Sequence, residues 1–241
     1  MSSSVDLQNM APPRRWRCFQ REGSLWSSHH SLSSGGICGV TAVAIEESDS
    51  AGGQVLLLGG DMEADEIVSL LQLVDLATGV CTPQAALLHG HRHSAAAGMP
   101  DGRIVCAGGL SDDRRMQSMV ENWGQPEHGV VDAACTWRAL PAMSVERSSC
   151  CGCMMSDGRF AVLGGWRDTH MSSCEALIIG DDEHWETLPP MHDSRASFAC
   201  AALDRCNIVA GGEAHRTIEV YDKVLDRWLR LPCDLPCHIG A

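Results

Sequence analysis

Four glycine pairs, each closing a short apolar segment, constrain the fold of this 241-residue chain more than any other feature. The segments read VLLLGG, IVCAGG, FAVLGG and NIVAGG, and the pairs end at Gly60, Gly109, Gly165 and Gly212. Successive pairs are therefore 49, 56 and 47 residues apart. A period near 50, with several strands in each unit, is typical of a β-propeller in which every repeat forms one blade.

A hairpin is expected before three of the glycine pairs. An arginine followed by small residues opens this segment at Arg92, Arg147 and Arg195, and the first glycine of the pair comes 16, 17 and 16 residues later. Two copies carry Asp-Gly at the turn, at 101–102 and 157–158. Because Asp-Gly accepts the positive φ angles of a two-residue turn, each copy predicts two antiparallel strands.

A second pair of strands is expected after each glycine pair. The third strand ends in an acidic residue in every repeat: Asp75, Asp132, Asp182 and Asp222. The fourth carries a tryptophan and then Leu-Pro in three repeats, at Trp137, Trp185 and Trp228, whereas Thr82 takes this place in the first repeat. Four elements in a fixed order predict a four-stranded blade.

This pattern resembles the kelch repeat, and the resemblance covers roughly residues 37–232. It implies an all-β fold, a kelch-type β-propeller of about four four-stranded blades. We assign residues 31–237 to the propeller repeats and residues 1–30 to an N-terminal segment that is expected to be partly disordered. The glycine pairs would let backbones approach closely near the axis, and the tryptophans would pack one blade on the next.

Four blades are few for a closed ring, and an open arc would expose long strand edges. Three arrangements stay open. The N-terminal segment, through Trp16 or Trp26, could add a closing strand that gives a small ring. Two incomplete arcs could join as a homodimer, or the chain could be a fragment of a longer propeller.

The net charge of −13 disfavours some classes of partner. Such a surface repels phosphate, so neither nucleic acid nor an anionic membrane is expected to bind, and a basic protein segment is favoured instead. Thirteen cysteines, an odd number scattered through the predicted strands, suggest a reducing compartment, and we expect a cytoplasmic protein. The N-terminus lacks the apolar stretch of a signal peptide, and no segment approaches the length of a membrane span.

Candidate binding residues come from two features. The second repeat has 28 residues between its glycine pair and its tryptophan, which predicts a long loop over Leu110 to His128. This loop contains charged residues and a tryptophan that could anchor a partner: Asp112, Asp113, Arg114, Arg115 and Trp123. The recurring Arg92, Arg147 and Arg195 could form a partial ring that grips acidic groups, or each could bond neighbouring blades by contacting carbonyls and acidic strand ends.

A protein-interaction module is the function that this combination favours, with a substrate-recognition or scaffold role. A ubiquitin ligase adaptor similar to some kelch proteins would need a separate helical domain, and only about 30 residues precede the repeats. The alternative is an enzyme that resembles kelch-like sugar-acid isomerases or metal-assisted lyases, with a central site drawing on His91, His192, His215 and Glu213. No spacing marks these residues as a catalytic group, so neither a cofactor nor a metal is expected.

Overall fold

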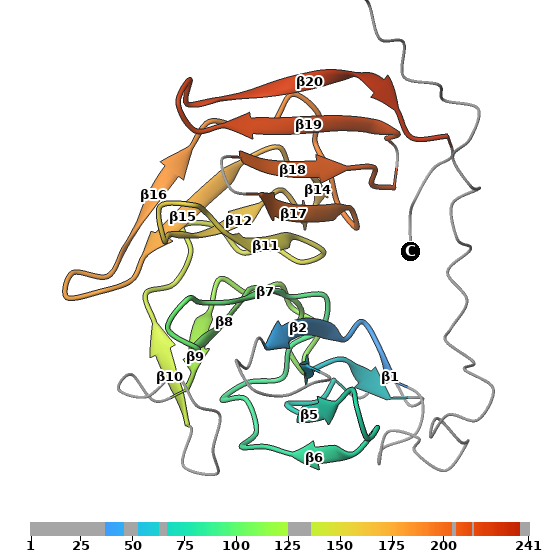
Figure 1. Ribbon diagram of the computed structural model, residues 1–241, viewed down its shortest axis with the longest axis vertical. Coiled ribbons are helices and arrows are strands. Elements are labelled where there is room, and N and C mark those ends of the chain that lie inside the picture. Colours follow the sequence, from blue (N-terminus) through green and yellow to red (C-terminus); the bar gives the residue numbers. More distant parts are fainter. Residues whose placement is uncertain are drawn as a thin grey trace, which may run out of the picture.

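The computed structural model describes residues 37–45, 53–62, 67–124, 136–203, 206–213 and 215–236. They form four antiparallel four-stranded sheets, and each sheet is one blade (Figure 1). Blade 1 contains β2 (Thr41–Ile45), β3 (Gln54–Leu58), β5 (Leu71–Asp75) and β6 (Cys81–Pro83). Blade 2 contains β7 (Ala95–Gly98), β8 (Ile104–Ala107), β9 (Val120–Trp123) and β10 (Trp137–Leu140).

The second half of the chain repeats this order. Blade 3 contains β11 (Cys151–Met154), β12 (Phe160–Leu163), β15 (Cys174–Ile178) and β16 (His184–Leu188). Blade 4 contains β17 (Ala199–Leu203), β18 (Cys206–Ala210), β19 (Thr217–Asp222) and β20 (Arg227–Asp234). Two short pairs lie outside the blades: β1 (Ile37–Cys38) pairs with β4 (Asp61–Met62), and β13 (Trp166–Arg167) pairs with β14 (Thr169–His170). The predicted all-β fold of about four four-stranded blades is confirmed.

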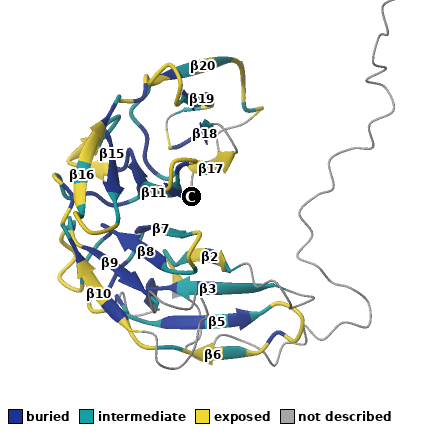
Figure 2. Cartoon of the chain, turned by 60° about the vertical axis from the view of Figure 1, so that its left-hand side comes forward, coloured by how far each residue is buried: buried dark blue, intermediate teal, exposed yellow. Residues whose placement is uncertain are grey.

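The blades follow one another around an open arc (Figure 2). Their innermost strands, β2, β7, β11 and β17, lie beside one another in chain order. Three buried apolar clusters fill the spaces between successive blades among the described residues. Strands β8, β9 and β12 are buried throughout, whereas the outer strands β6, β16 and β20 are largely exposed. Residues 1–30, which include the proposed closing strand, lie outside the described residues.

The glycine pairs lie where the sequence placed them, directly after the second strand of each blade. Their role is close approach between blades. Gly165 has a φ of +111°, its N–H donates to the carbonyl of Arg195 at 2.7 Å, and a Cβ placed on it would lie 2.8 Å from the carbonyl oxygen of Ser148. The N–H groups of Gly60 and Gly109 bond the next blade in the same way, through the carbonyls of His91 and Arg147.

The Asp-Gly turns are one residue longer than predicted. In blade 2, Met99 and Arg103 close the hairpin by a backbone hydrogen bond of 2.7 Å, which leaves three residues between them. Gly102 alone has a positive φ there, of 85°. Gly158 has the corresponding place in blade 3, with a φ of 87°. The aspartate therefore does not need the left-handed conformation that a two-residue turn would require.

The blade tryptophans bind the preceding blade as well as packing on it. The indole N–H groups of Trp137, Trp185 and Trp228 donate to the carbonyls of Ala85, Pro141 and Pro189, at 3.0, 2.7 and 2.9 Å. Each acceptor lies in the segment that leaves the preceding blade. The predicted packing role of these tryptophans is confirmed, and a hydrogen bond adds direction to it.

Candidate functional site

Two of the three recurring arginines lie inside the blades. Arg195 donates from Nη1 to the carbonyls of Gly211 and Thr217, at 2.6 and 2.9 Å, and from Nη2 to Glu219 at 2.8 Å. Arg147 bonds Gly164, Ser173 and Glu175 in the same pattern, each at 2.9 Å. Both arginines are almost fully buried. The hypothesis of an exposed arginine ring is therefore wrong for these two, because their donors are used within the fold.

The equivalent position in blade 2 is held by His91 and not by Arg92. The carbonyl of His91 accepts from the preceding glycine pair, as those of Arg147 and Arg195 do. Its Nδ1 lies 2.7 Å from the carbonyl of Gly108, and its Nε2 lies 2.6 Å from the carboxylate of Glu121. Since a carbonyl only accepts, Nδ1 must carry a proton.

Arg92 is consequently displaced by one residue toward the surface. Its guanidinium pairs with Asp61 at 3.1 Å, and its Nε lies 3.2 Å from Nε2 of His93. The side chain of Arg92 is one-quarter exposed. Of the three arginines named from the sequence, it is the one that reaches the face of the arc formed by the loops that follow the second and fourth strands. We call this side the loop face.

Trp123 is fully buried, so its predicted role as an exposed anchor is wrong. It lies in the third strand of blade 2, opposite Trp137, with ring centroids 6.4 Å apart. Tyr221 and Trp228 form the matching pair in blade 4, at 5.4 Å. The third strand of blade 2 therefore runs over Val120–Trp123 and does not end at Asp132, and that of blade 3 ends at Ile178 and not at Asp182. The extra length of repeat 2 lies after this strand, between Trp123 and Trp137.

The charged part of the predicted loop is confirmed as a loop and is well structured. The N–H of Ser111 donates to the carbonyl of Arg115 at 2.9 Å, and that of Arg114 donates to Ser111 at 2.7 Å. Arg115 also pairs with Asp113 at 3.2 Å. The hydroxyl of Ser111 donates to Asp113, and this bond, more than the nearby Arg115, holds the pKa of the Asp113 carboxyl below its usual value.

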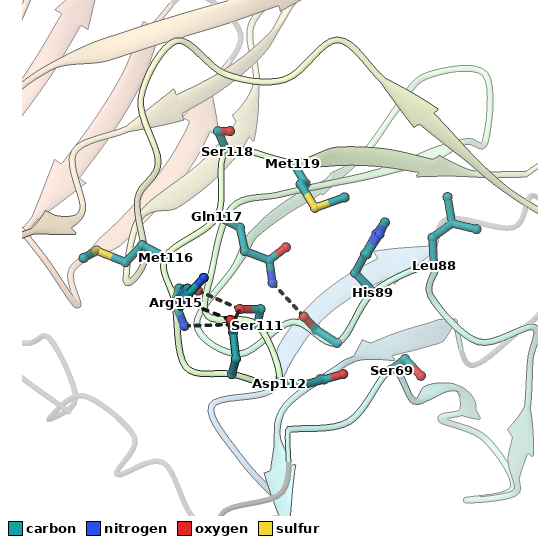
Figure 3. Close-up of a pocket in the computed structure, with 12 residues that line it drawn as sticks. Ser69, Leu88, His89, Ser111, Asp112, Arg115, Met116, Gln117, Ser118 and Met119 are labelled. Carbon is teal, nitrogen blue, oxygen red and sulfur yellow. Dashed lines mark hydrogen bonds and ion pairs between the residues drawn. The ribbon is translucent and has the colours of Figure 1, made fainter.

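A pocket of about 560 Å³ opens between this loop and the segment that joins blade 1 to blade 2 (Figure 3). Asp112, Asp113 and Arg115 line it from the loop, and His89 and Leu88 line it from the joining segment. The structure therefore brings three of the predicted loop residues to one concave site. Arg147, Arg195 and Trp123 do not contribute to it.

Two further residues shape the floor of this pocket. Gln117 is buried and donates from Nε2 to the carbonyl of Gly90 at 3.0 Å. A Cβ placed on Gly90 would lie 2.1 Å from Oδ1 of Asp112, so the carboxylate rests directly on this glycine. A larger residue at position 90 would push Asp112 out of its place. Sequence reasoning missed both residues, because neither belongs to the repeat pattern.

A second group on the loop face comes from blades 3 and 4. Trp166 contacts His170 edge-to-face, with centroids 4.9 Å apart. His170 lies 3.2 Å from Glu213, which also accepts a hydrogen bond of 2.9 Å from Ser197. The bonds from His170 and then Ser197 hold the pKa of Glu213 below its usual value. An exposed aromatic beside ionisable groups is typical of a binding surface.

The residues named for an enzyme do not converge. His91 is enclosed with Glu121, and Nε2 of His192 lies 3.0 Å from the carbonyl of Trp228. His215 faces Asp193, while Glu213 pairs with His170. Within the described part of the chain, no three His, Cys, Asp or Glu side chains are grouped as metal ligands. The same residues include no helix with the length and apolar character to cross a membrane.

The blades and their motifs define a propeller of the kelch type, and comparison with known proteins agrees. The chain is 27% identical to Kelch domain-containing protein 8B of Homo sapiens over 184 residues, which are 72% of this chain and 48% of that protein. It is 30% identical to an F-box/kelch-repeat protein of Arabidopsis thaliana over 86 residues, 32% of this chain and 21% of the relative. No protein-family model matches the chain. The chain spans about half the length of the 8B relatives that it matches.

Proposed function

We propose that this chain is a protein-binding module that uses its loop face to hold a protein partner. The observation that carries the proposal is the pocket beside Asp112 and Arg115, which two successive blades build together. Loops fixed at both ends by paired strands keep their shape without a partner, so little conformational entropy is lost on binding. Trp166 offers a second contact on the same face, and its side chain is 37% exposed.

A substrate-recognition or scaffold role is the finer form of this proposal. One relative carries F-box in its name together with kelch repeat, which supports an adaptor-like role among the candidates. The net charge of −13 supports a protein partner over nucleic acid or an anionic membrane. The ten described cysteines are free thiols, which supports the proposal of a cytoplasmic location.

The test compares partner capture by two matched variants of the full chain. The loop-face variant carries Arg115→Ala and Trp166→Ala, which remove one cation and one large apolar side chain. The control variant carries Lys223→Ala and Val224→Ala in the turn between β19 and β20, on the opposite face, where Val224 is 92% exposed. Proteins captured from extract of the source cells are quantified by mass spectrometry for each variant.

We expect wild type and control to capture the same set of proteins and the loop-face variant to lose at least one of them about tenfold or more, since truncating an interface anchor typically costs 2 kcal/mol or more. Equal capture by all three proteins would contradict the proposal. Circular dichroism must show that both variants are folded, because only then does a loss report on the surface.

A further inference from the structure

The pocket on the loop face contains one carboxylate that nothing neutralises within the described residues. Asp112 lines the pocket, and its side chain has no hydrogen-bond or ion-pair partner there. Its neighbour Asp113 differs, because Ser111 and Arg115 both bond it. In Figure 3 the carboxylate of Asp112 points across the pocket floor toward Ser69. A negative group held in this way attracts a cation.

An unpartnered acceptor lies on the same floor. Gln117 is 94% buried, since only 6% of it is exposed, and its Oε1 has no hydrogen-bond partner among the described residues. The identity of this atom is fixed chemically, because the other amide atom faces the carbonyl of Gly90 and must therefore be the NH₂ group. A buried acceptor without a donor is costly, and a ligand that supplies one recovers that free energy.

Gly90 places the two acceptors next to each other. Its carbonyl holds the amide nitrogen of Gln117, and its missing side chain leaves the space that Oδ1 of Asp112 fills. In Figure 3 the amide oxygen of Gln117 points toward the side where His89 lies. The two acceptors face the pocket from different directions, which suits a planar group with several donors better than a single point charge.

The remaining walls suit an aliphatic chain. Leu88, Met116 and Met119 line the pocket, and Leu88 and Met119 are among the exposed large apolar residues. Methionine side chains adapt to the shape of an alkyl stem. The described lining contains no Phe, Tyr or Trp ring. The pocket therefore offers hydrogen bonds to a cation and not an aromatic cage.

The cations already present do not fill this place. The guanidinium of Arg115 is held by Asp113 and is 84% exposed. Nδ1 of His89 lies 4.0 Å from Oε1 of Glu121, whose two oxygens already face His91 and the N–H of Leu88. Asp112 is thus left as the uncompensated charge of the pocket.

We propose that this pocket binds the guanidinium of an arginine on a protein partner. The guanidinium donates to the carboxylate of Asp112 and to Oε1 of Gln117, while its alkyl chain lies along Met116 and Met119. This assignment rests on the proposed protein-binding function, and it names the side chain that the loop face selects.

Methyl NMR on the full chain tests the proposal. Methionine methyl groups are labelled with carbon-13, and the signals of Met116 and Met119 are assigned through leucine substitutions. The probe is N-acetylarginine methylamide, and N-acetylcitrulline methylamide, of the same shape but without charge, is the matched control. We expect both methyl signals to shift and to saturate with the arginine probe, and the citrulline probe to bind about tenfold more weakly, as expected for loss of a charge-assisted hydrogen bond.

Two variants place the effect at the pocket. Asp112→Asn should weaken arginine binding about tenfold, whereas Asp182→Asn, an equal charge change on the opposite face, should leave it unchanged. Absence of saturable shifts at Met116 and Met119, equal binding of citrulline, or unchanged binding in Asp112→Asn would each overturn the proposal. Because the probe is a single amino-acid derivative, such a failure is distinct from a failure of partner capture.

Discussion

At the scale of the residue, the buried pair of Arg195 and Glu219 is the most constrained feature of the molecule. Both side chains are fully buried, and Glu219 also accepts from the N–H groups of His192 and Asp193, at 2.7 and 3.1 Å. Glu219→Ala removes these bonds and leaves a buried guanidinium charge with one remaining carboxylate, that of Asp193. We expect a loss of about 3–5 kcal/mol in the free energy of unfolding, measured by urea denaturation.

An exposed ion pair is the control for this loss. Glu183 pairs with Arg138, whose side chain is 55% exposed. Glu183→Ala should change the free energy of unfolding by about 1 kcal/mol or less, because water screens such pairs. In the double variant Arg195→Met with Glu219→Leu, the loss should be smaller than the sum of the two single losses. Full additivity would mean that the pair does not act as a unit.

The cysteine thiols give a residue-scale prediction for pH. Burial raises the pKa of Cys106 and Cys174 to about 12, and that of Cys150 to about 11. Since the folded state keeps these protons when the unfolded state loses them near pH 9, their contribution to stability is full below pH 9 and is lost as the pH rises toward 11–12. Urea midpoints should therefore fall between pH 9 and pH 11.

Thiol labelling checks the same assignment directly. Cys38 and Cys233 are exposed, whereas Cys106, Cys150 and Cys174 are buried. Brief treatment of the native protein with iodoacetamide at pH 8 should modify the exposed pair first, because the thiolate is the reactive species. Peptide mass spectrometry that finds Cys106 modified as fast as Cys233 would contradict the assignment.

At the scale of the element, the glycine that ends a second strand and the glycine of a hairpin turn make a matched comparison. Gly158 has a φ of +87° with nothing within 4 Å of a new Cβ, so Gly158→Ala costs backbone strain alone, about 1–3 kcal/mol. Gly165→Ala adds clashes at 2.8 Å with the carbonyl of Ser148 and at 2.9 Å with Cys150. We expect the larger drop in melting temperature for Gly165→Ala; equal drops would show that the close approach between blades carries no energetic weight.

The sequence predicts the elements that local chemistry specifies, and it fails where register decides. The glycine pairs and tryptophans recur at near-constant spacing, so their strands were predictable. His91 was passed over for Arg92 because only the backbone bonds reveal which residue enters the blade. Trp123 was taken for a loop residue because an insertion before the third strand and one after it give the same chain length.

The buried glutamates show the same limit from another side. Glu121, Glu175 and Glu219 follow the first glycine of the pair by 13, 11 and 8 residues, so no fixed spacing marks them. A usable signal is the large side chain two residues later, at Trp123, Leu177 and Tyr221. The pocket itself could be predicted only in part, because its charged loop was visible in the sequence, whereas the contact of Asp112 with Gly90 depends on tertiary structure.

At the scale of the whole molecule, two copies of the arc could meet across the open side, which is the homodimer that the sequence left open. Four of the five residues of β17, the innermost strand of blade 4, are exposed. Exposed strands of this kind are sites for association. We propose this pairing as one arrangement of the chain in solution. Light scattering tests it, because one copy has a mass of 25.9 kDa and a dimer has twice that mass.

The open arc also predicts how damage in one blade spreads. Each blade packs on its neighbours in chain order, through the three clusters between blades 1 and 2, 2 and 3, and 3 and 4. Stability in such an array is a sum of units and nearest-neighbour interfaces. Glu219→Gln, which weakens blade 4, should therefore raise amide hydrogen exchange in β17–β20 most, in blade 3 less, and in β2–β6 least. In a closed ring blade 1 would adjoin blade 4, so an increase in blade 1 equal to that in blade 3, measured by mass spectrometry on the full chain, would show that the ring closes in solution.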